Sequence, residues 1–115
     1  MTPEEIVTSV FAGVRGRDHN AVANLYAPDA RLTVMDGTVH EGRDAIRDFY
    51  HNVVTVTKPN PQVVGLFVNL PMVAAVINAG STEHFANAVD VFHVEDGAIR
   101  SMRICMFTDV PALSG

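Results

Sequence analysis

The second half of the chain most constrains its fold, because it reads as consecutive β-strands with no helix between them. Runs rich in valine, isoleucine, phenylalanine and threonine alternate with turn signals, a pattern typical of strands. The four expected strands span residues 63–68, 72–78, 82–94 and 98–107. Strands joined by short turns pair antiparallel, so this half predicts an antiparallel sheet.

Three helical patterns and one hairpin precede these strands. Residues 2–5, Thr-Pro-Glu-Glu, indicate a helix start with a capping box, and apolar residues follow at helical spacing. A second, short helix is expected to be capped by Asp18 or Asn20 and to run through Tyr26. Residues 31–40 predict a hairpin around an Asp-Gly turn, and residues 45–53 carry the apolar stripe of a third helix.

Helices gathered on one side of a strongly curved antiparallel sheet make an α+β domain. We expect residues 1–115 to form one such domain, with three N-terminal helices packed on a sheet that curls into a cone around an apolar pocket. The outer sheet face would carry Val89, Val91, Cys105 and Phe107. That face is too apolar for water, which predicts a homodimer formed through it.

Composition argues against several classes of protein. The net charge is −5 and the basic residues are scattered, which disfavours nucleic acid as a partner. No apolar stretch approaches the ~18 residues of a spanning helix and no signal peptide opens the chain, so we expect no membrane partner. The single cysteine, Cys105, fits a reducing cytoplasm. The five histidines lack zinc-ligand spacing and no phosphate loop is present, so no metal and no cofactor are expected.

Asp90 is the unusual residue of the strand at 82–94. Alternate strand residues share a face, so Ala86, Ala88, Asp90, Phe92 and Val94 point the same way. Asp90 is the one ionisable group in this apolar row. Because burying a bare charge is costly, its carboxyl must find a partner, reach water or stay protonated.

Two registers are open at the hairpin that follows. If Asp96-Gly97 is a two-residue turn, Asp90 lies opposite Arg103 and forms a plain salt bridge. If the preceding glutamate joins a three-residue loop, Asp90 faces Met102 instead. The second register is favoured because it leaves one continuous apolar face around the aspartate. That face holds Asp90, Phe92, Met102, Ile104 and Met106. Asp90 is then expected to line the pocket, with its pKa raised by desolvation.

Four other polar residues are candidates for the same pocket. His84 shares the face of Asp90, so it is expected at the pocket or at the sheet edge. Asp36, in the hairpin turn, is either a plain turn aspartate or a candidate for this pocket. His40 could approach the pocket rim, although a surface role is the favoured alternative. Tyr50 is expected in the core, with its hydroxyl near the pocket.

Five segments together resemble a known family over essentially the whole chain. Residues 20–32 resemble its "aLyApDA" helix-to-strand signature, and residues 40–50 resemble its "hGreaIraFY" segment. Residues 89–92, 96–97 and 101–103 resemble its closing hairpin. The family is the nuclear transport factor 2-like superfamily, in its SnoaL-like and ketosteroid-isomerase branch. The resemblance implies the cystatin-like cone.

The resemblance also implies roles for single residues. The steroid isomerases have an oxyanion-hole aspartic acid where Asp90 stands, and Tyr50 matches a supporting pocket tyrosine. Val10 and Val34 stand where those enzymes have a tyrosine and a general-base aspartate. Asp36, two residues further on, would replace that base only if the loop is shifted. SnoaL-type polyketide cyclases, which work with one central aspartate, are therefore the better match.

These observations predict a small cofactor-free enzyme. It would bind a flat, apolar carbonyl compound, steroid-like or polyketide-like, and move a proton through Asp90 with Asp36 or His40 assisting. The expected substrate-binding residues are Val10, Val34, Tyr50, His84, Phe92, Met102 and Met106. A non-catalytic binding or dimerisation domain is the alternative reading, and an epoxide hydrolase is the third.

Overall fold

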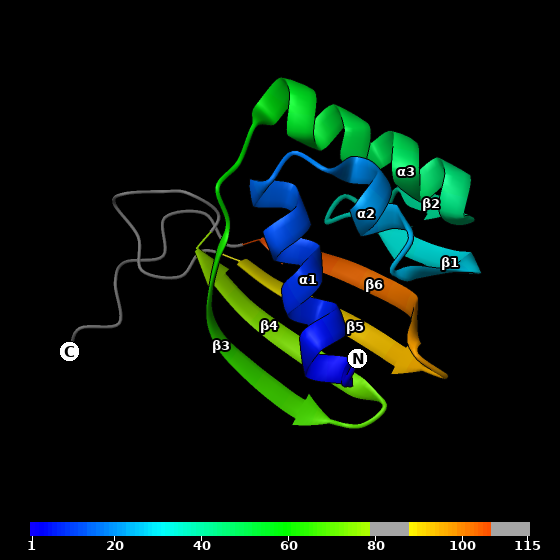
Figure 1. Ribbon diagram of the computed structural model, residues 1–115, viewed down its shortest axis with the longest axis vertical. Helices are drawn as coiled ribbons and strands as arrows, with labels where there is room; N and C mark the ends of the chain where they lie inside the picture. The colour runs from blue at the N-terminus through cyan, green and yellow to red at the C-terminus, as the bar shows by residue number, and fades with distance from the viewer. Residues whose placement is uncertain (79–87, 107–115) are drawn as a thin grey trace.

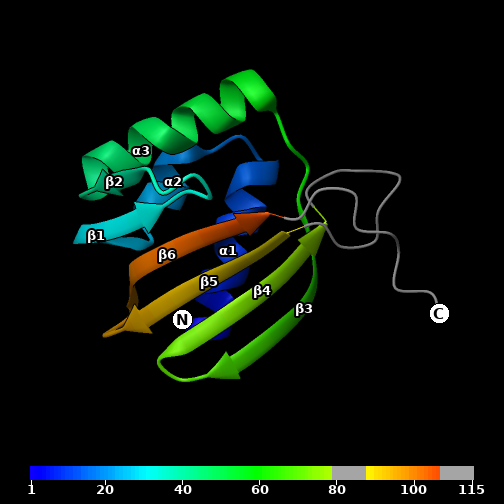
Figure 2. The ribbon, with the colours of Figure 1, turned by 180° about the vertical axis from the view of Figure 1, so that it is seen from behind.

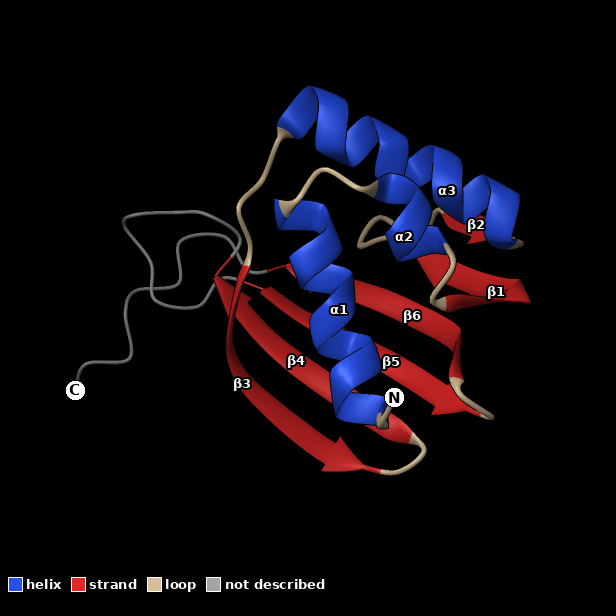
Figure 3. Cartoon of the chain, in the orientation of Figure 1, coloured by secondary structure: helices blue, strands red, loops and turns tan. Residues whose placement is uncertain are grey.

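A computed structural model of the chain describes residues 1–78 and 88–106, with Met106 described by its backbone alone (Figure 1). The helices are α1 (Pro3–Arg15), α2 (His19–Ala23), α3 (Arg43–Asn52) and the π-helix η1 (Val53–Thr57). The strands are β1 (Tyr26–Thr33), β2 (Val39–Glu41), β3 (Gln62–Asn69), β4 (Met72–Asn78), β5 (Ala88–Glu95) and β6 (Ala98–Met106). Figure 3 shows the helices on one side of a strongly curved sheet. The predicted α+β cone is therefore confirmed.

The six strands form one sheet in the order β2-β1-β6-β5-β4-β3. The last four strands pair antiparallel in sequence order, as predicted. β1 joins them by pairing parallel with β6. Because β1 and β6 lie far apart in sequence, no short turn forces them to be antiparallel. The helices cover one face, with α1 across β3, β4 and β5 and α3 over β1 and β2. Figure 2, seen from behind, shows the opposite face of the sheet.

The first two helices begin as the sequence predicts, but the second ends earlier. Thr2 accepts a hydrogen bond from the Glu5 amide at 3.1 Å, and Glu5 Oε1 accepts one from the Thr2 amide at 2.7 Å. The expectation that the second helix runs through Tyr26 is wrong, because Tyr26 begins β1. Its carbonyl oxygen accepts from Arg43 Nε at 3.0 Å and from Nη2 at 2.7 Å. These contacts and its pairing with Ile99 hold Tyr26 in an extended strand.

The β5–β6 hairpin differs from both expected registers. The turn has two residues, with Asp96 and Gly97 both at positive φ, so the favoured three-residue loop is wrong. A β-bulge at Arg100 then adds one residue to β6, and Asp90 pairs with Ile104. The extra residue restores the predicted alternation, since a shift of one residue reverses the faces. The described side chains on the shared face are those of Asp90, Phe92, Met102 and Ile104.

The core lies between the helices and this face of the sheet. Phe92 is fully buried and meets Phe11 of α1 edge-on, with ring centroids 6.0 Å apart. Leu32 of β1 and Ile46 of α3 are also fully buried. The core thus joins the apolar stripes of α1 and α3 to β1 and β5, and several of its residues also line a cavity.

Candidate functional site

A cavity of about 320 Å³ lies between the helices and the inner sheet face. Its walls come from α1, α3, η1, the connector before β3 and strands β4, β5 and β6. The residues that line it are Val10, Phe11, Val14, Phe49, Tyr50, Val53, Thr57, Pro59, Pro61, Ile77, Asp90, Met102 and Ile104. Nearly all of these side chains are apolar. Such a cavity suits an apolar small molecule held by a few polar groups.

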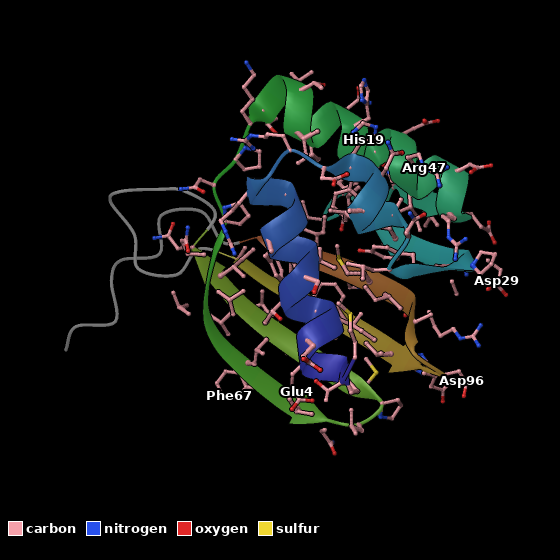
Figure 4. All side chains as sticks on the ribbon, in the orientation of Figure 1. Glu4, His19, Asp29, Arg47, Phe67 and Asp96 are labelled. Carbon is pink, nitrogen blue, oxygen red and sulfur yellow. The ribbon has the colours of Figure 1, made fainter. Side chains whose placement is uncertain are left out.

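Asp90 is the acidic group of this cavity. Its side chain lies on β5 and is 5% exposed, and among the described residues it is the one buried charged side chain. By contrast, the acidic residues Glu4, Asp29 and Asp96 lie at the outside of the fold (Figure 4). Within the described ranges Asp90 Oδ1 has no hydrogen-bond partner. Burial raises the pKa of this carboxyl to about 7, because the charged form loses its hydration. The neutral and ionised forms are therefore both accessible near neutral pH.

Two tyrosine hydroxyls form a buried pair next to the cavity. The hydroxyl oxygens of Tyr26 and Tyr50 are 2.6 Å apart, and both side chains are buried. Burial raises the pKa of both hydroxyls, and the nearby carboxyl of Asp90 raises each further. Tyr50 lines the cavity, whereas Tyr26 does not. If Tyr26 donates to Tyr50, the Tyr50 proton is available to a ligand in the cavity.

Asp36 and His40, the two proposed assisting residues, lie elsewhere. Asp36 is exposed in the β1–β2 turn, where its Oδ1 accepts from the Thr38 amide at 2.9 Å. This hydrogen bond lowers the pKa of Asp36. His40 is half-buried on β2, with its ring centroid 4.9 Å from that of Phe49. Neither residue belongs to the described lining of the cavity.

The expected substrate-binding residues divide into three groups. Val10, Tyr50 and Met102 line the cavity. Val34 is half-buried against the core and Phe92 is fully buried within it, and neither contributes to the lining. Phe92 packs instead against Phe11 of α1, and Val34 packs against the core cluster. His84 and the side chain of Met106 fall outside the described part of the structure.

One wall of the cavity comes from residues that the sequence did not identify. Thr57, Pro59 and Pro61 lie in η1 and in the connector that follows it. The sequence indicates only an irregular connector here. The sequence feature that could have indicated this wall is the pair of prolines that follows the apolar stripe of the third helix. That signal is weak because their closeness to the cavity depends on where the connector crosses α1.

A larger hollow of about 490 Å³ lies on the opposite face of the sheet. Arg31, Thr33, Val91 and Arg103 are among its lining residues. Both arginines are exposed, and the hollow contains no buried ionisable group among its described lining residues. Size alone would favour this hollow, but its described lining includes no buried carboxyl like that of Asp90. The Asp90 cavity is therefore the candidate site.

Two further features of the described residues bear on the class of protein. None of the helices there combines the length and apolarity that a membrane crossing requires. Within residues 1–78 and 88–106, no three histidine, cysteine, aspartate or glutamate side chains gather as metal ligands would.

The curved sheet, the helices on one face and the apolar cavity between them make the fold of nuclear transport factor 2-like and ketosteroid isomerase-like proteins. Residues 7–102 match the family model of the SnoaL-like domain. The chain therefore belongs to the SnoaL-like domain family. A sequence comparison with functionally described proteins gives no match.

Solved structures resemble the chain over most of its length. A nuclear transport factor 2-like protein from Cytophaga hutchinsonii is 19% identical with a TM-score of 0.75, covering 92% of this chain and 90% of that one. A ketosteroid isomerase-like protein from Catenulispora acidiphila, in complex with trimethylamine, is 18% identical with a TM-score of 0.76, covering 93% and 88%. SalBIII, an epoxide hydrolase/cyclase-like enzyme with a role in pyran ring formation in the polyether salinomycin, is 26% identical with a TM-score of 0.76, covering 90% and 89%.

Proposed function

We propose that the chain binds an apolar carbonyl compound, steroid-like or polyketide-like, in the Asp90 cavity and transfers a proton through Asp90. The observation that carries this proposal is a buried carboxyl with an unpartnered oxygen, within the described residues, in an otherwise apolar cavity. Burial without a hydrogen-bond partner destabilises a carboxylate unless a ligand or a proton compensates. A group held in this state is poised for acid–base chemistry.

The proposed step uses the two forms of the Asp90 carboxyl in turn. The carboxylate takes a proton from the carbon next to the ligand carbonyl, and the electron pair moves to the carbonyl oxygen as an enolate. Tyr50 donates a hydrogen bond to that oxygen, with Tyr26 donating in turn to Tyr50. The carboxylic acid then returns the proton to a second carbon, which isomerises the compound. Asp36 and His40 have no part in this step, because neither lines the cavity.

The same residues would serve a cyclase with a different final step. The enolate carbon would then attack a second carbonyl of a polyketide-like chain, and the acid would protonate the new alkoxide. No cofactor or metal is needed for either reaction. The free thiol of Cys105 is in keeping with a reducing cytoplasm, the location that we propose.

The proposal is tested by turnover of a β,γ-unsaturated ketosteroid. Replacing Asp90 by Asn should lower turnover by about 10²–10⁴-fold, the usual contribution of a positioned acid–base group. Tyr50→Phe should lower it less, because it removes one hydrogen bond to the oxygen. Asp36→Asn is the matched control and should leave turnover unchanged, because Asp36 lies exposed in a turn. Turnover that survives the Asp90 change would refute the proposed step.

A non-catalytic binding domain is the second candidate. It is favoured by the fact that Asp90 is the one acidic side chain among the described residues that line the cavity. Wild-type protein that binds apolar ketones and phenols, but turns none over, would support this reading. Epoxide hydrolysis or cyclisation, suggested by the likeness to SalBIII, is the third. Conversion of an apolar epoxide that depends on Asp90 would favour it.

We also propose that two copies of the chain pair through the outer sheet face. Strand register aligns Phe67, Ala74 and Val91 in one row across β3, β4 and β5. Phe67 is 66% exposed, and Val91 and Cys105 are half-buried on the same face. Covering these side chains would remove apolar surface from water.

Light scattering after size-exclusion chromatography tests this pairing. The wild-type chain should run as a dimer, and Val91→Arg should run as a monomer because the new arginine would lie beside Arg103, its neighbour on β6, and two like charges would then meet within the contact. Thr8→Arg, on the exposed side of α1, should remain dimeric. A monomeric wild type would overturn the pairing.

A further inference from the structure

We propose that Arg17 sets the size of ligand that the Asp90 cavity accepts, by holding residues 57–61 against the end of α1. We call residues 57–61 the strap. The inference rests on the proposed binding of an apolar compound in this cavity. It assigns a specificity-determining role to an exposed arginine that lies outside the cavity.

The strap forms one wall of the cavity. Thr57, Pro59 and Pro61 supply its lining side chains. Only its first residue, Thr57, belongs to η1, and β3 begins directly after the strap at Gln62. Pro59 and Pro61 have no amide hydrogen, so they cannot donate to a helix or a sheet. The first part of the strap is held by its own donors, since the Lys58 amide and the Thr57 hydroxyl donate to the Val53 carbonyl at 2.9 and 2.8 Å. At the two prolines, contacts made by the carbonyl oxygens take over this role.

Two arginines at the end of α1 make those contacts. Arg17 Nη1 donates to the Pro59 carbonyl at 2.6 Å, and its Nη2 donates to the Lys58 carbonyl at 2.8 Å. Arg15 Nη1 donates to the Pro61 carbonyl at 2.8 Å. A planar guanidinium holds two neighbouring acceptors in a fixed geometry, which a lysine cannot do. Because Pro59 both lines the cavity and accepts from Arg17, a shift of the arginine shifts the lining.

Backbone conformation at both ends of this contact supports the inference. Arg17 has φ 58° and Lys58 has φ 47°, in the left-handed region that residues other than glycine rarely adopt. The two residues are in direct contact, because the Arg17 guanidinium donates to the Lys58 carbonyl. The strap also begins at the last residue of a π-helix. This form is rare in proteins overall, and where it occurs it often lies at a functional site. Unfavourable local conformations persist where the surroundings enforce them, and they cluster at ligand-binding sites.

The opposing view is that Arg17 only stabilises the fold. Two apolar phenols of different width distinguish the readings, 2-naphthol with two rings and 1-hydroxypyrene with four. Their dissociation constants are measured by fluorescence for the full chain, and the selectivity is the ratio of the two constants. Wild type should prefer 2-naphthol. Arg17→Ala should shift the ratio toward 1-hydroxypyrene by about tenfold or more, and Arg17→Lys should give a smaller shift in the same direction.

Two comparisons make the outcome decisive. Arg100→Ala removes another surface arginine, which pairs with Asp29 and Asp96, and it should leave the ratio at the wild-type value. If Arg17→Ala lowers the unfolding midpoint but leaves the ratio unchanged, the role is structural and the inference is overturned. If Arg17→Ala does not fold, the ratio in Arg17→Lys decides in the same way.

The test also separates this inference from the proposed function. Asp90→Asn should change the affinity for 2-naphthol, because the phenol hydroxyl would contact that side chain. Wild-type protein that binds neither phenol would overturn the proposed function and this inference together. Binding that responds to Asp90 but keeps the same ratio in both Arg17 variants would overturn the inference alone.

Discussion

Replacing Asp90 by Asn should remove a pH dependence of stability that the wild-type protein carries. The folded protein raises the pKa of this carboxyl from an ordinary value of 3.8 to about 7. Between these values the folded chain keeps a proton that the unfolded chain has released. The unfolded state binds fewer protons, so the free energy of unfolding falls as pH rises through this window. Above about pH 7 the Asp90 carboxyl is ionised in both the folded and the unfolded state, and its contribution to the free energy of unfolding has been lost.

The size of the effect follows from the shift. A rise of about three pKa units corresponds to about 4 kcal/mol of unfolding free energy, at 1.36 kcal/mol per unit. About 3 kcal/mol of this falls between about pH 5 and about pH 8, because part of the loss occurs at lower pH. The asparagine side chain of the variant does not titrate, so this part of the pH dependence should vanish. Burial is the cause of the raised pKa of Asp90, and the Asp90 carboxyl in turn adds to the raised pKa of the Tyr26 and Tyr50 hydroxyls.

Urea unfolding at about pH 5 and about pH 8 measures the difference. With an m-value of about 2 kcal/mol/M, the wild-type midpoint should fall by roughly 1.5 M more than that of Asp90→Asn. The rest of the chain is identical in the two proteins, so the comparison between them cancels every other source of pH dependence. Asp36→Asn is the second control and should follow the wild type, because the lowered pKa of Asp36 places its titration below this window. Equal pH dependence in wild type and Asp90→Asn would refute the raised pKa and the acid–base argument built on it.

Three further substitutions test the packing and capping around the site. Gly13→Ala should lower stability by about 1–3 kcal/mol, because the added Cβ would clash with Val22 Cγ2, and an unchanged urea midpoint would contradict this packing. Thr2→Ala should lower stability by about 1 kcal/mol and speed amide exchange in the first turn of α1, whereas unchanged exchange would argue against the cap. Tyr26→Phe should cost about 1–3 kcal/mol and weaken phenol binding, since it leaves the buried Tyr50 hydroxyl without its partner; unaltered binding would remove Tyr26 from the proposed relay.

Local patterns predicted the elements that frame the site. The capping box at Thr2 and the apolar stripe after it identify α1, because both signals lie within a few turns of one helix. The alternation around Asp90 predicted that this carboxyl would share an apolar face with Phe92. These features depend on spacing along the chain, so they can be recognised without knowing what packs against them.

Other features depend on contacts between distant segments. The Arg100 bulge changes which residue faces Asp90, and neither expected register included it. The strap reaches the cavity only because Arg15 and Arg17 lie beside it at the end of α1. No nearby residue in the sequence signals either contact.

The sequence by itself determined an α+β domain with one aspartate in an apolar strand row, because periodicity and turn chemistry act over a few residues. Tertiary structure alone decided that Asp90 is buried with an unpartnered oxygen within the described residues, and that Tyr50 and Pro59 border the same cavity. The loss of hydration at Asp90 and the shape of the cavity both depend on several helices and strands that come together only on folding. The pKa of Asp90 is therefore a property of the assembled sheet and helices rather than of the strand that carries it.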